Sequence, residues 1–218
     1  MAKPLYVLGA GGHAAVLVDI LKGNDEKIEA IFSPSLDKAK KVLADVKILQ
    51  DEDILFKENN TNILLINGIG SLPGNILRQT VYKKFRERGY EFKQVLSKHA
   101  IISPFAVLGD GVQVMPGAII QAGAEVGENT IINTGAIIEH DCIIGKHNHI
   151  APGVTLSGQV NTGDFVHIGT GAAVIQNISI GCNSVVSAGA IITKNIANKK
   201  IAFGARSNIQ DKKDKYES

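Results

Sequence analysis

The sequence of 218 residues contains no tryptophan, and aromatic residues make up only 5% of it. Its formal net charge is +2, and its basic residues gather in no concentrated stripe. Nucleic-acid binding needs a basic surface, and the recognition of unpaired bases also needs aromatic side chains for stacking. These two deficits exclude nucleic acid from the partners that we expect.

Cysteine is scarce too, because Cys142 and Cys182 are too few for a disulfide framework. The first residues lead into an apolar run, Leu5–Leu8, without the basic segment or cleavage site of a secretion signal. The longest uncharged stretch, 165–193, contains His167 and several Asn, Ser and Gly residues, which argues against a membrane span. We therefore expect a cytoplasmic protein without membrane insertion.

Charge and leucine are unevenly distributed along the chain. Residues 1–98 contain 27 Asp, Glu, Lys and Arg residues, residues 99–198 contain 8, and residues 199–218 contain 9. Of the 15 leucines, only Leu108 and Leu156 follow residue 98. The composition predicts two domains of different construction, 1–98 and 99–198, and a tail, 199–218, whose charged end (211–218) we expect to be disordered.

An aliphatic residue returns at every sixth position of the second domain, with Thr162 as the one exception. Alternate residues of a short strand point the same way, and the residues two positions earlier are mostly small. Both columns are therefore expected to face inward. The aliphatic column is Ile102, Leu108, Val114, Ile120, Val126, Ile132, Ile138, Ile144, Ile150, Leu156, Ile168, Val174, Ile180, Val186 and Ile192.

Two rows of glycine recur every 18 residues, so three six-residue segments make one coil. Glycine at fixed corners permits tight turns, and the short strands of successive coils can pair in parallel. The pattern predicts a triangular β-solenoid of about five coils and excludes an α-solenoid, whose period is 3.6 residues. The rows are Gly109, Gly127, Gly145, Gly163 and Gly181, and Gly117, Gly135, Gly153, Gly171 and Gly189.

These repeats resemble those of the hexapeptide-repeat acyltransferases. The resemblance implies a left-handed parallel β-helix, which is an exception to the right-handed crossover rule. It also implies a homotrimer that binds acetyl-coenzyme A (acetyl-CoA) between neighbouring coils.

The first domain alternates strand-like and helix-like segments, which predicts a small parallel sheet. Its first strand runs into the glycine turn Gly9–Gly12, followed by His13, and such glycines and free helix amides favour a phosphate. As a dinucleotide fingerprint the turn fits poorly, because Ser33-Pro34-Ser35 stands where an acidic ribose partner would be expected. The expected elements are strands 5–8, 28–32 and 62–67 and helices 14–21, 36–44 and 75–88.

The two halves together resemble the sialic acid O-acetyltransferase-like nucleotide-sugar acetyltransferases. The sequence GAGGHA, the pair Asn133-Thr134 and the segment Ile138-Glu139-His140-Asp141 carry this resemblance. Within that family, it is greatest to the UDP-4-amino-sugar N-acetyltransferases of bacillosamine biosynthesis. It implies an α/β fold, in which a Rossmann-like nucleotide-sugar-binding domain precedes the left-handed β-helix.

His140 follows inward-facing Ile138 by two residues and is therefore expected at a corner of a coil. Acetyl transfer to an amine needs a proton acceptor, and a histidine oriented by a carboxylate suits that role. The resemblance makes His140 the general base and gives Asp141 the role of raising its basicity. Cys142 is expected to face the core, which excludes it as a nucleophile and as a zinc ligand beside the histidines, so no metal is expected.

His149 and His167 are 18 residues apart and should stack on one face, one coil apart. By resemblance His149, Thr170 and Ala188 contact acetyl-CoA, and Gly158 and His167 are further candidates for the same groove. The nucleotide sugar is assigned by resemblance to a second set of residues in the first domain. That set is Gly11, Gly12, His13, Gly68 and Gly70.

We therefore expect an acetyl-CoA-dependent N-acetyltransferase with His140 as base. Its expected acceptor is the 4-amino group of a nucleotide-linked sugar, such as UDP-4-amino-4,6-dideoxy-N-acetylglucosamine. Two alternatives stay open from the sequence, an O-acetyltransferase of sialic acid or another sugar and a non-catalytic scaffold that binds sugar nucleotides. The sequence also leaves the nucleotide open among UDP, GDP and CMP.

Overall fold

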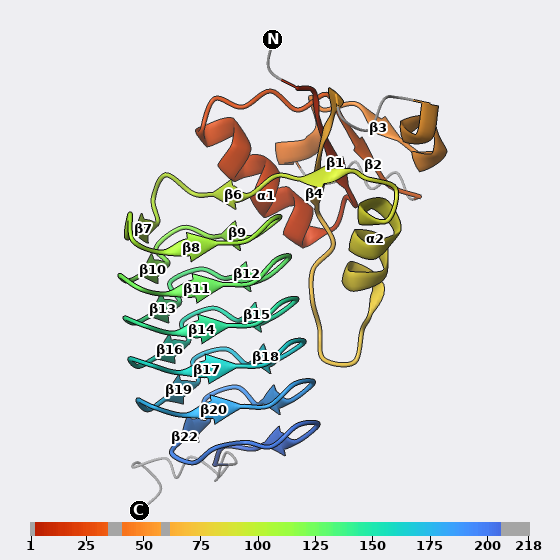
Figure 1. Cartoon of the computed structure of the whole chain (residues 1–218). Coiled ribbons are helices and arrows are strands. Elements are labelled where there is room, and N and C mark those ends of the chain that lie inside the picture. Colours follow the sequence, from red (N-terminus) through yellow and green to blue (C-terminus); the bar gives the residue numbers. More distant parts are fainter. Residues whose placement is uncertain (1–2, 35–40, 58–61, 206–218) are drawn as a thin grey trace, which may run out of the picture.

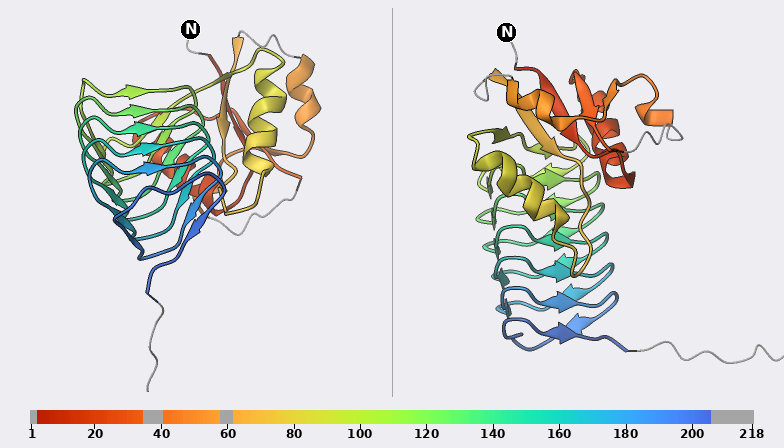
Figure 2. Two further views of the ribbon diagram at one scale, coloured as in Figure 1. Left: turned by 60° about the horizontal axis from the view of Figure 1, so that its bottom comes forward. Right: turned by 90° about the vertical axis from the view of Figure 1, so that its right-hand side faces the viewer.

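A computed structural model describes residues 3–34, 41–57 and 62–205, which form a sheet with flanking helices and a column of stacked coils (Figure 1). The sheet lies beside the first coils, and the loop after its fourth strand runs along the column (Figure 2). Within these described residues, no helix has the length and apolar character needed to cross a membrane.

The sheet has five parallel strands in the order β3-β2-β1-β4-β5. Its central strand is apolar throughout because both of its faces are covered, as is usual in parallel sheets. The strands are β1 (Leu5–Leu8), β2 (Ala30–Phe32), β3 (Ile48–Leu49), β4 (Leu64–Asn67) and β5 (Glu91–Phe92).

Two α-helices, α1 (Gly12–Gly23) and α2 (Leu77–Arg86), cover opposite faces of this sheet. Ile66 of β4 belongs to the hydrophobic cluster around α1, whereas its neighbour Leu65 belongs to the cluster around α2. The α1 cluster also contains Ile131 of the coils. Helix α1 therefore lies between the sheet and the coils and joins the two parts through its apolar side chains.

Most elements expected for the first domain are confirmed, with shorter bounds for β2, β4 and α2. Strands β3 and β5 were not predicted, because two-residue strands carry too little pattern. Of the helix expected at 36–44, only a 3₁₀ turn, η1 (Lys41–Leu43), is seen, and residues 36–40 lie outside the described residues. The expected disordered end, 211–218, also lies outside them. A second 3₁₀ helix is η2 (Glu52–Lys57).

The coils form a triangular prism with three parallel sheets. The first face holds β7 (Ile101–Ile102), β10 (Ile119–Ile120), β13 (Ile137–Ile138), β16 (Thr155–Leu156), β19 (Ala173–Val174) and β22 (Ile191–Ile192). The second face holds β8 (Val107–Leu108), β11 (Glu125–Val126), β14 (Ile143–Ile144), β17 (Asn161–Thr162) and β20 (Ser179–Ile180). The third face holds β6 (Val95–Leu96), β9 (Gln113–Val114), β12 (Ile131–Ile132), β15 (His149–Ile150), β18 (His167–Ile168), β21 (Val185–Val186) and β23 (Ile201–Ala202).

The 18-residue coil is confirmed by the strand pairing, in which Ile120 pairs with Ile138 and Ile138 with Leu156. The aliphatic column is buried from Val114 onward and forms one continuous core. Strands β6 and β23 extend the third face beyond the 99–198 range expected for the repeats.

Thr162, which interrupts the aliphatic column, belongs to a polar pair inside the core. Asn148 Nδ2 donates to Thr162 Oγ1 at 2.6 Å and to the Gly163 carbonyl at 3.0 Å, and Val166 N–H donates to Asn148 Oδ1 at 2.6 Å. Both buried polar side chains are thus hydrogen-bonded, which offsets their removal from water.

The two glycine rows serve different purposes. In the row of Gly117, φ lies between 65° and 72°, a left-handed backbone conformation that glycine adopts without strain. The row of Gly109 lacks positive φ, but a Cβ atom there would lie closer than 3.0 Å to the backbone of the next coil. One row therefore permits the turns, and the other permits the close stacking of coils.

Candidate active site

His140 and Asp141 form a hydrogen-bonded pair at the corner between the first and second faces. His140 Nδ1 lies 2.9 Å from Asp141 Oδ2, and the two side chains are 60% and 57% exposed. Because an ionised carboxylate only accepts hydrogen bonds, Nδ1 carries the proton and Nε2 keeps its lone pair. The arrangement leaves one basic nitrogen accessible from solvent.

Gly158 lies one coil beyond this pair, directly against the His140 ring. The two coils are joined here by the Gln159 N–H, which donates to the His140 carbonyl at 3.0 Å. The Gly158 N–H itself donates to no group among residues 62–205. Within residues 62–205, a backbone donor without an acceptor therefore lies next to the histidine.

His149 and His167 stack on the third face as predicted, with ring centroids 4.9 Å apart and an interplanar angle of 81°. His149 Nδ1–H donates to the Ser71 carbonyl, and Nε2 accepts from Asn133 Nδ2, both at 3.1 Å. Burial lowers the pKa of His149 to about 3, so the ring is neutral near pH 7. His167 Nδ1 is buried and has no hydrogen-bond partner within the described part of the chain.

His13, in the first turn of α1, is held by a side chain of the first coil. Gln113 Nε2 donates to the Asn67 carbonyl at 2.8 Å, so Gln113 Oε1 is the acceptor for His13 Nε2–H at 2.7 Å. Burial and the nearby Arg78 charge lower the pKa of His13 to about 4. At neutral pH the His13 ring is therefore uncharged, and Nδ1 is available as an acceptor.

Four predicted residues from the two ligand sets line one pocket of about 470 Å³ between α1, the loop after β4 and the third face. They are Gly12, His13, Gly70 and His149. Gly11 is exposed and precedes α1 as its N-cap. Gly68 is buried, and a Cβ atom there would meet the Val7 and Ala14 side chains, so the close packing of β4 requires this glycine.

Thr170 and Ala188 are exposed at the corner between the third and first faces, on successive coils. The Gly189 N–H donates to the Thr170 carbonyl at 2.9 Å and ties these coils together. His140 lies at a different corner from Thr170 and Ala188, and His149 lies on the third face. One chain therefore brings the candidate base together with Gly158, but not with His149, Thr170 or Ala188.

Arg78 of α2 was not singled out by the sequence, yet it joins the sheet to the coils. It is 5% exposed, and its guanidinium donates to the carbonyls of Asn67 at 3.0 Å, Ile69 at 2.6 Å and Asn129 at 3.2 Å. Burial lowers the pKa of Arg78 to about 9. An arginine inside a helical segment carries no sequence signal of such a role. Asn67 does carry one, because it is a polar residue at the end of an apolar strand.

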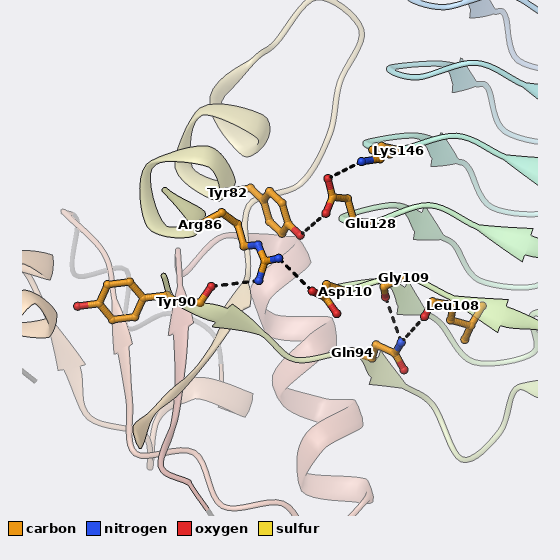
Figure 3. Close-up of polar contacts among 9 residues, drawn as sticks. All are labelled: Tyr82, Arg86, Tyr90, Gln94, Leu108, Gly109, Asp110, Glu128 and Lys146. Atoms are coloured by element: carbon orange, nitrogen blue, oxygen red, sulfur yellow. Dashed lines mark hydrogen bonds and ion pairs between the residues drawn. The ribbon is translucent and has the colours of Figure 1, made fainter. Parts of the chain in front are cut away.

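Away from Arg78, partly buried and exposed contacts join the same two parts (Figure 3). Tyr82 Oη donates to Glu128 Oε2 at 3.2 Å, and Arg86 pairs with Asp110 at 3.2 Å. Gln94 Nε2 donates to the Leu108 carbonyl at 2.7 Å. Helix α2 and the segment after β5 are therefore held against the first coils by contacts additional to those of Arg78.

Cys142 faces the core, as the repeat register predicted. It is fully buried, its Sγ donates to the Ser157 carbonyl at 3.3 Å, and burial raises the pKa of the thiol. A buried thiol with a raised pKa is a poor nucleophile. Among the described residues, no group of three His, Cys, Asp or Glu side chains is arranged to hold a metal ion.

Residues 123–158 match the bacterial transferase hexapeptide (six repeats) family, whose repeats fit a left-handed parallel β-helix. Several solved structures share the whole architecture. PerB from Caulobacter crescentus, in complex with CoA and GDP-perosamine, is 32% identical over 95% of this chain and 97% of that chain, with a TM-score of 0.82. A histidine-to-asparagine variant of perosamine N-acetyltransferase from the same organism, also with CoA and GDP-perosamine, is 30% identical over 96% and 97%, with a TM-score of 0.83.

The acetyltransferase domain of PglB from Neisseria gonorrhoeae, in complex with acetyl coenzyme A, is 26% identical over 94% of this chain and 97% of that chain. Its TM-score is 0.82. The likeness to these structures covers both the sheet and the coils.

Proposed function

The chain belongs to the bacterial hexapeptide transferases and is an acetyl-CoA-dependent acyltransferase, and we propose that it acetylates the 4-amino group of a nucleotide-linked amino sugar. The observation that carries this proposal is the match over 95% of the chain to a structure with CoA and the nucleotide amino sugar GDP-perosamine. The proposed acceptor is UDP-4-amino-4,6-dideoxy-N-acetylglucosamine or a GDP-linked 4-amino sugar.

The His140–Asp141 pair supports general-base catalysis. The neutral 4-amino nitrogen attacks the thioester carbonyl carbon of acetyl-CoA, and His140 Nε2 takes the proton that the nitrogen loses. Asp141 holds Nδ1–H and stabilises the imidazolium. When the tetrahedral intermediate collapses, the C–S bond breaks and the proton passes to the departing thiolate, which leaves an amide and CoA. We assign the Gly158 N–H, which donates to no group among residues 62–205, as a donor to the developing oxyanion.

The N-terminal sheet supports a Rossmann-like nucleotide-sugar domain at 1–98, preceding an acetyltransferase domain at 99–198. Its strand order, 3-2-1-4-5, is that of doubly wound folds, which bind ligands outside the carboxyl ends of the strands. A pocket of about 530 Å³ lies there and is lined by Gly9, Phe32 and Ser33. The free amides at the start of α1, next to Gly11 and Gly12, suit the diphosphate.

A homotrimer is proposed because one chain separates His140 from His149. The outer side of the coils also carries exposed apolar residues around the His140 corner, among them Ile101, Phe105 and Ile143, which are 67%, 76% and 51% exposed. Such a surface is typical of a contact with another subunit. In a trimer, His140 of one copy would reach the acetyl-CoA bound along His149, Thr170 and Ala188 of the next.

Release of CoA thiol from acetyl-CoA, measured with UDP- and GDP-linked 4-amino sugars, tests the activity. No release with any nucleotide amino sugar would contradict the proposal. Treatment of the product with mild alkali separates the proposed amide from the ester that O-acetylation would give. Unchanged function of His140→Ala would instead indicate a non-catalytic binding scaffold.

A further inference from the structure

Almost every glycine of the coils has a structural reason to be glycine. Within residues 99–198, all of which the structure describes, seven glycines have a positive φ. Six others have ordinary φ values, but a Cβ atom there would lie closer than 3.0 Å to backbone atoms of the next coil. These six are Gly109, Gly127, Gly145, Gly163, Gly169 and Gly181.

Gly158 fits neither group. Its φ is not in the left-handed region, and the three atoms nearest to its Cβ position all belong to the His140 ring. They are Nε2 at 2.5 Å, Cε1 at 2.6 Å and Cδ2 at 3.2 Å. The backbone would accept alanine here, whereas the His140 ring would not.

The other member of the pair has a matching neighbour on the preceding coil. A Cβ atom on Gly123 would contact Asp141 Oδ1, and its distance to Asp141 Cγ would be 3.4 Å. Gly123 also has a positive φ of 75°, so the backbone alone would explain that glycine. At Gly158, therefore, the requirement for glycine can be assigned to the His140 ring and not to the backbone conformation.

We propose that Gly158 is a positioning residue for His140, whose ring occupies the space that a side chain at 158 would fill. This inference rests on the proposed function, in which His140 is the base. Ordinary van der Waals contact begins at 3.4 Å, so a methyl group at 158 would move Nε2 from 2.5 Å by about 0.9 Å. That displacement alters the geometry of the ring relative to Asp141 and changes where Nε2 meets the substrate amine.

Gly158→Ala tests this inference, with Gly23→Ala as the matched control. Gly23 has an ordinary φ, and a Cβ atom there would meet only Lys98 Cε at 4.0 Å. We expect kcat to fall about 100-fold in Gly158→Ala, because an error of about 1 Å in positioning can cost that much. The KM for the nucleotide sugar and the thermal midpoint should stay at their wild-type values. Alanine keeps the N–H at 158, so the loss cannot come from a missing backbone donor.

A double-mutant cycle separates positioning from simple obstruction. In the His140→Ala background, Gly158→Ala should cause no further loss of the residual rate, because there is no ring left to displace. An equal loss in both backgrounds would mean that the methyl group blocks the substrates, and would overturn the inference. Wild-type turnover of Gly158→Ala, or failure of this variant to fold, would overturn it too.

A crystal structure of Gly158→Ala tests the geometry independently of activity. We expect the His140 ring to be displaced from its wild-type position, and an unmoved ring would contradict the inference. If the wild-type enzyme released no CoA while the variant showed the displaced ring, the proposed function would fail and the positioning role would stand.

Discussion

The Nδ1–H of His149 donates to the carbonyl oxygen of Ser71, so a side chain of the third face holds the loop that follows β4. Ser71 and Gly70 lie in the pocket that also contains His13. The candidate acetyl-CoA residue His149 thus lines the same pocket as three candidate nucleotide-sugar residues, Gly12, His13 and Gly70. A movement of this loop would therefore change the candidate acetyl-CoA region and the candidate nucleotide-sugar region together.

Mixing two inactive variants tests the proposed site between subunits. His140→Ala and His149→Ala should each lose most activity. When they are unfolded, mixed 1:1 and refolded, each mixed trimer contains one junction with both histidines, so about one quarter of wild-type turnover should return. No recovery, with mixed trimers shown by mass spectrometry, would place the whole site within one chain.

Replacing His140 by alanine should lower kcat by about 10² to 10⁴, because a well-placed general base contributes that much. The thermal midpoint should stay unchanged, since the side chain is 60% exposed. His99→Ala is the matched control, because His99 is also exposed on the coils and lies outside the candidate site. Steady-state CoA release decides the matter, and turnover above one tenth of wild type would exclude His140 as the base.

Stability should fall as the pH is lowered from about 6.5 towards 4. Burial holds the pKa values of His13 and His149 at about 4 and 3, below the ordinary value of 6.5. Over that range the unfolded chain binds protons that the folded chain does not, so unfolding is favoured by up to about 1.4 kcal/mol per pH unit for each histidine. Urea unfolding between pH 4 and pH 8 measures the slope.

His149→Gln should make that slope shallower, because the protonation difference that His149 contributes disappears. An identical slope in the variant would show that His149 titrates normally in the folded protein.

Arg78→Met should destabilise the protein by about 3 kcal/mol, because buried carbonyl acceptors on β4, the loop and the coils lose their donor. It should also raise the KM for the nucleotide sugar, since the loop containing Gly70 is no longer fixed. Arg86→Met is the matched control on the same helix, and its exposed pair with Asp110 should contribute less than about 1 kcal/mol. Equal destabilisation by the two variants would contradict the role of Arg78.

The repeat part could be predicted from sequence because its pattern is local and redundant. Ile120, Ile138 and Leu156 occupy the same position in successive coils, so their pairing follows directly from the 18-residue spacing. The stacking of His149 on His167 could be read from their spacing for the same reason.

The connections between the two parts could not be predicted. Arg78 and Asn129 meet across 51 positions of sequence, and His13 and Gln113 across 100. Such contacts depend on how α1 and α2 dock against the coils, and no periodic pattern encodes that docking. The contact of Gly158 with the His140 ring was also not predicted, because the resemblance marked Gly158 only as a candidate for the acetyl-CoA groove.

The polar pair of Asn148 and Thr162 has a consequence for how the column assembles. Similar aliphatic coils could stack one coil out of step during folding, because each offers nearly the same surface to its neighbour. In such a shifted arrangement Asn148 would face Ile180 instead of Thr162, and its buried amide would lose a partner at about 1 to 3 kcal/mol. The pair of Asn148 and Thr162 therefore favours the correct pairing of its two coils and opposes misalignment of the repeats.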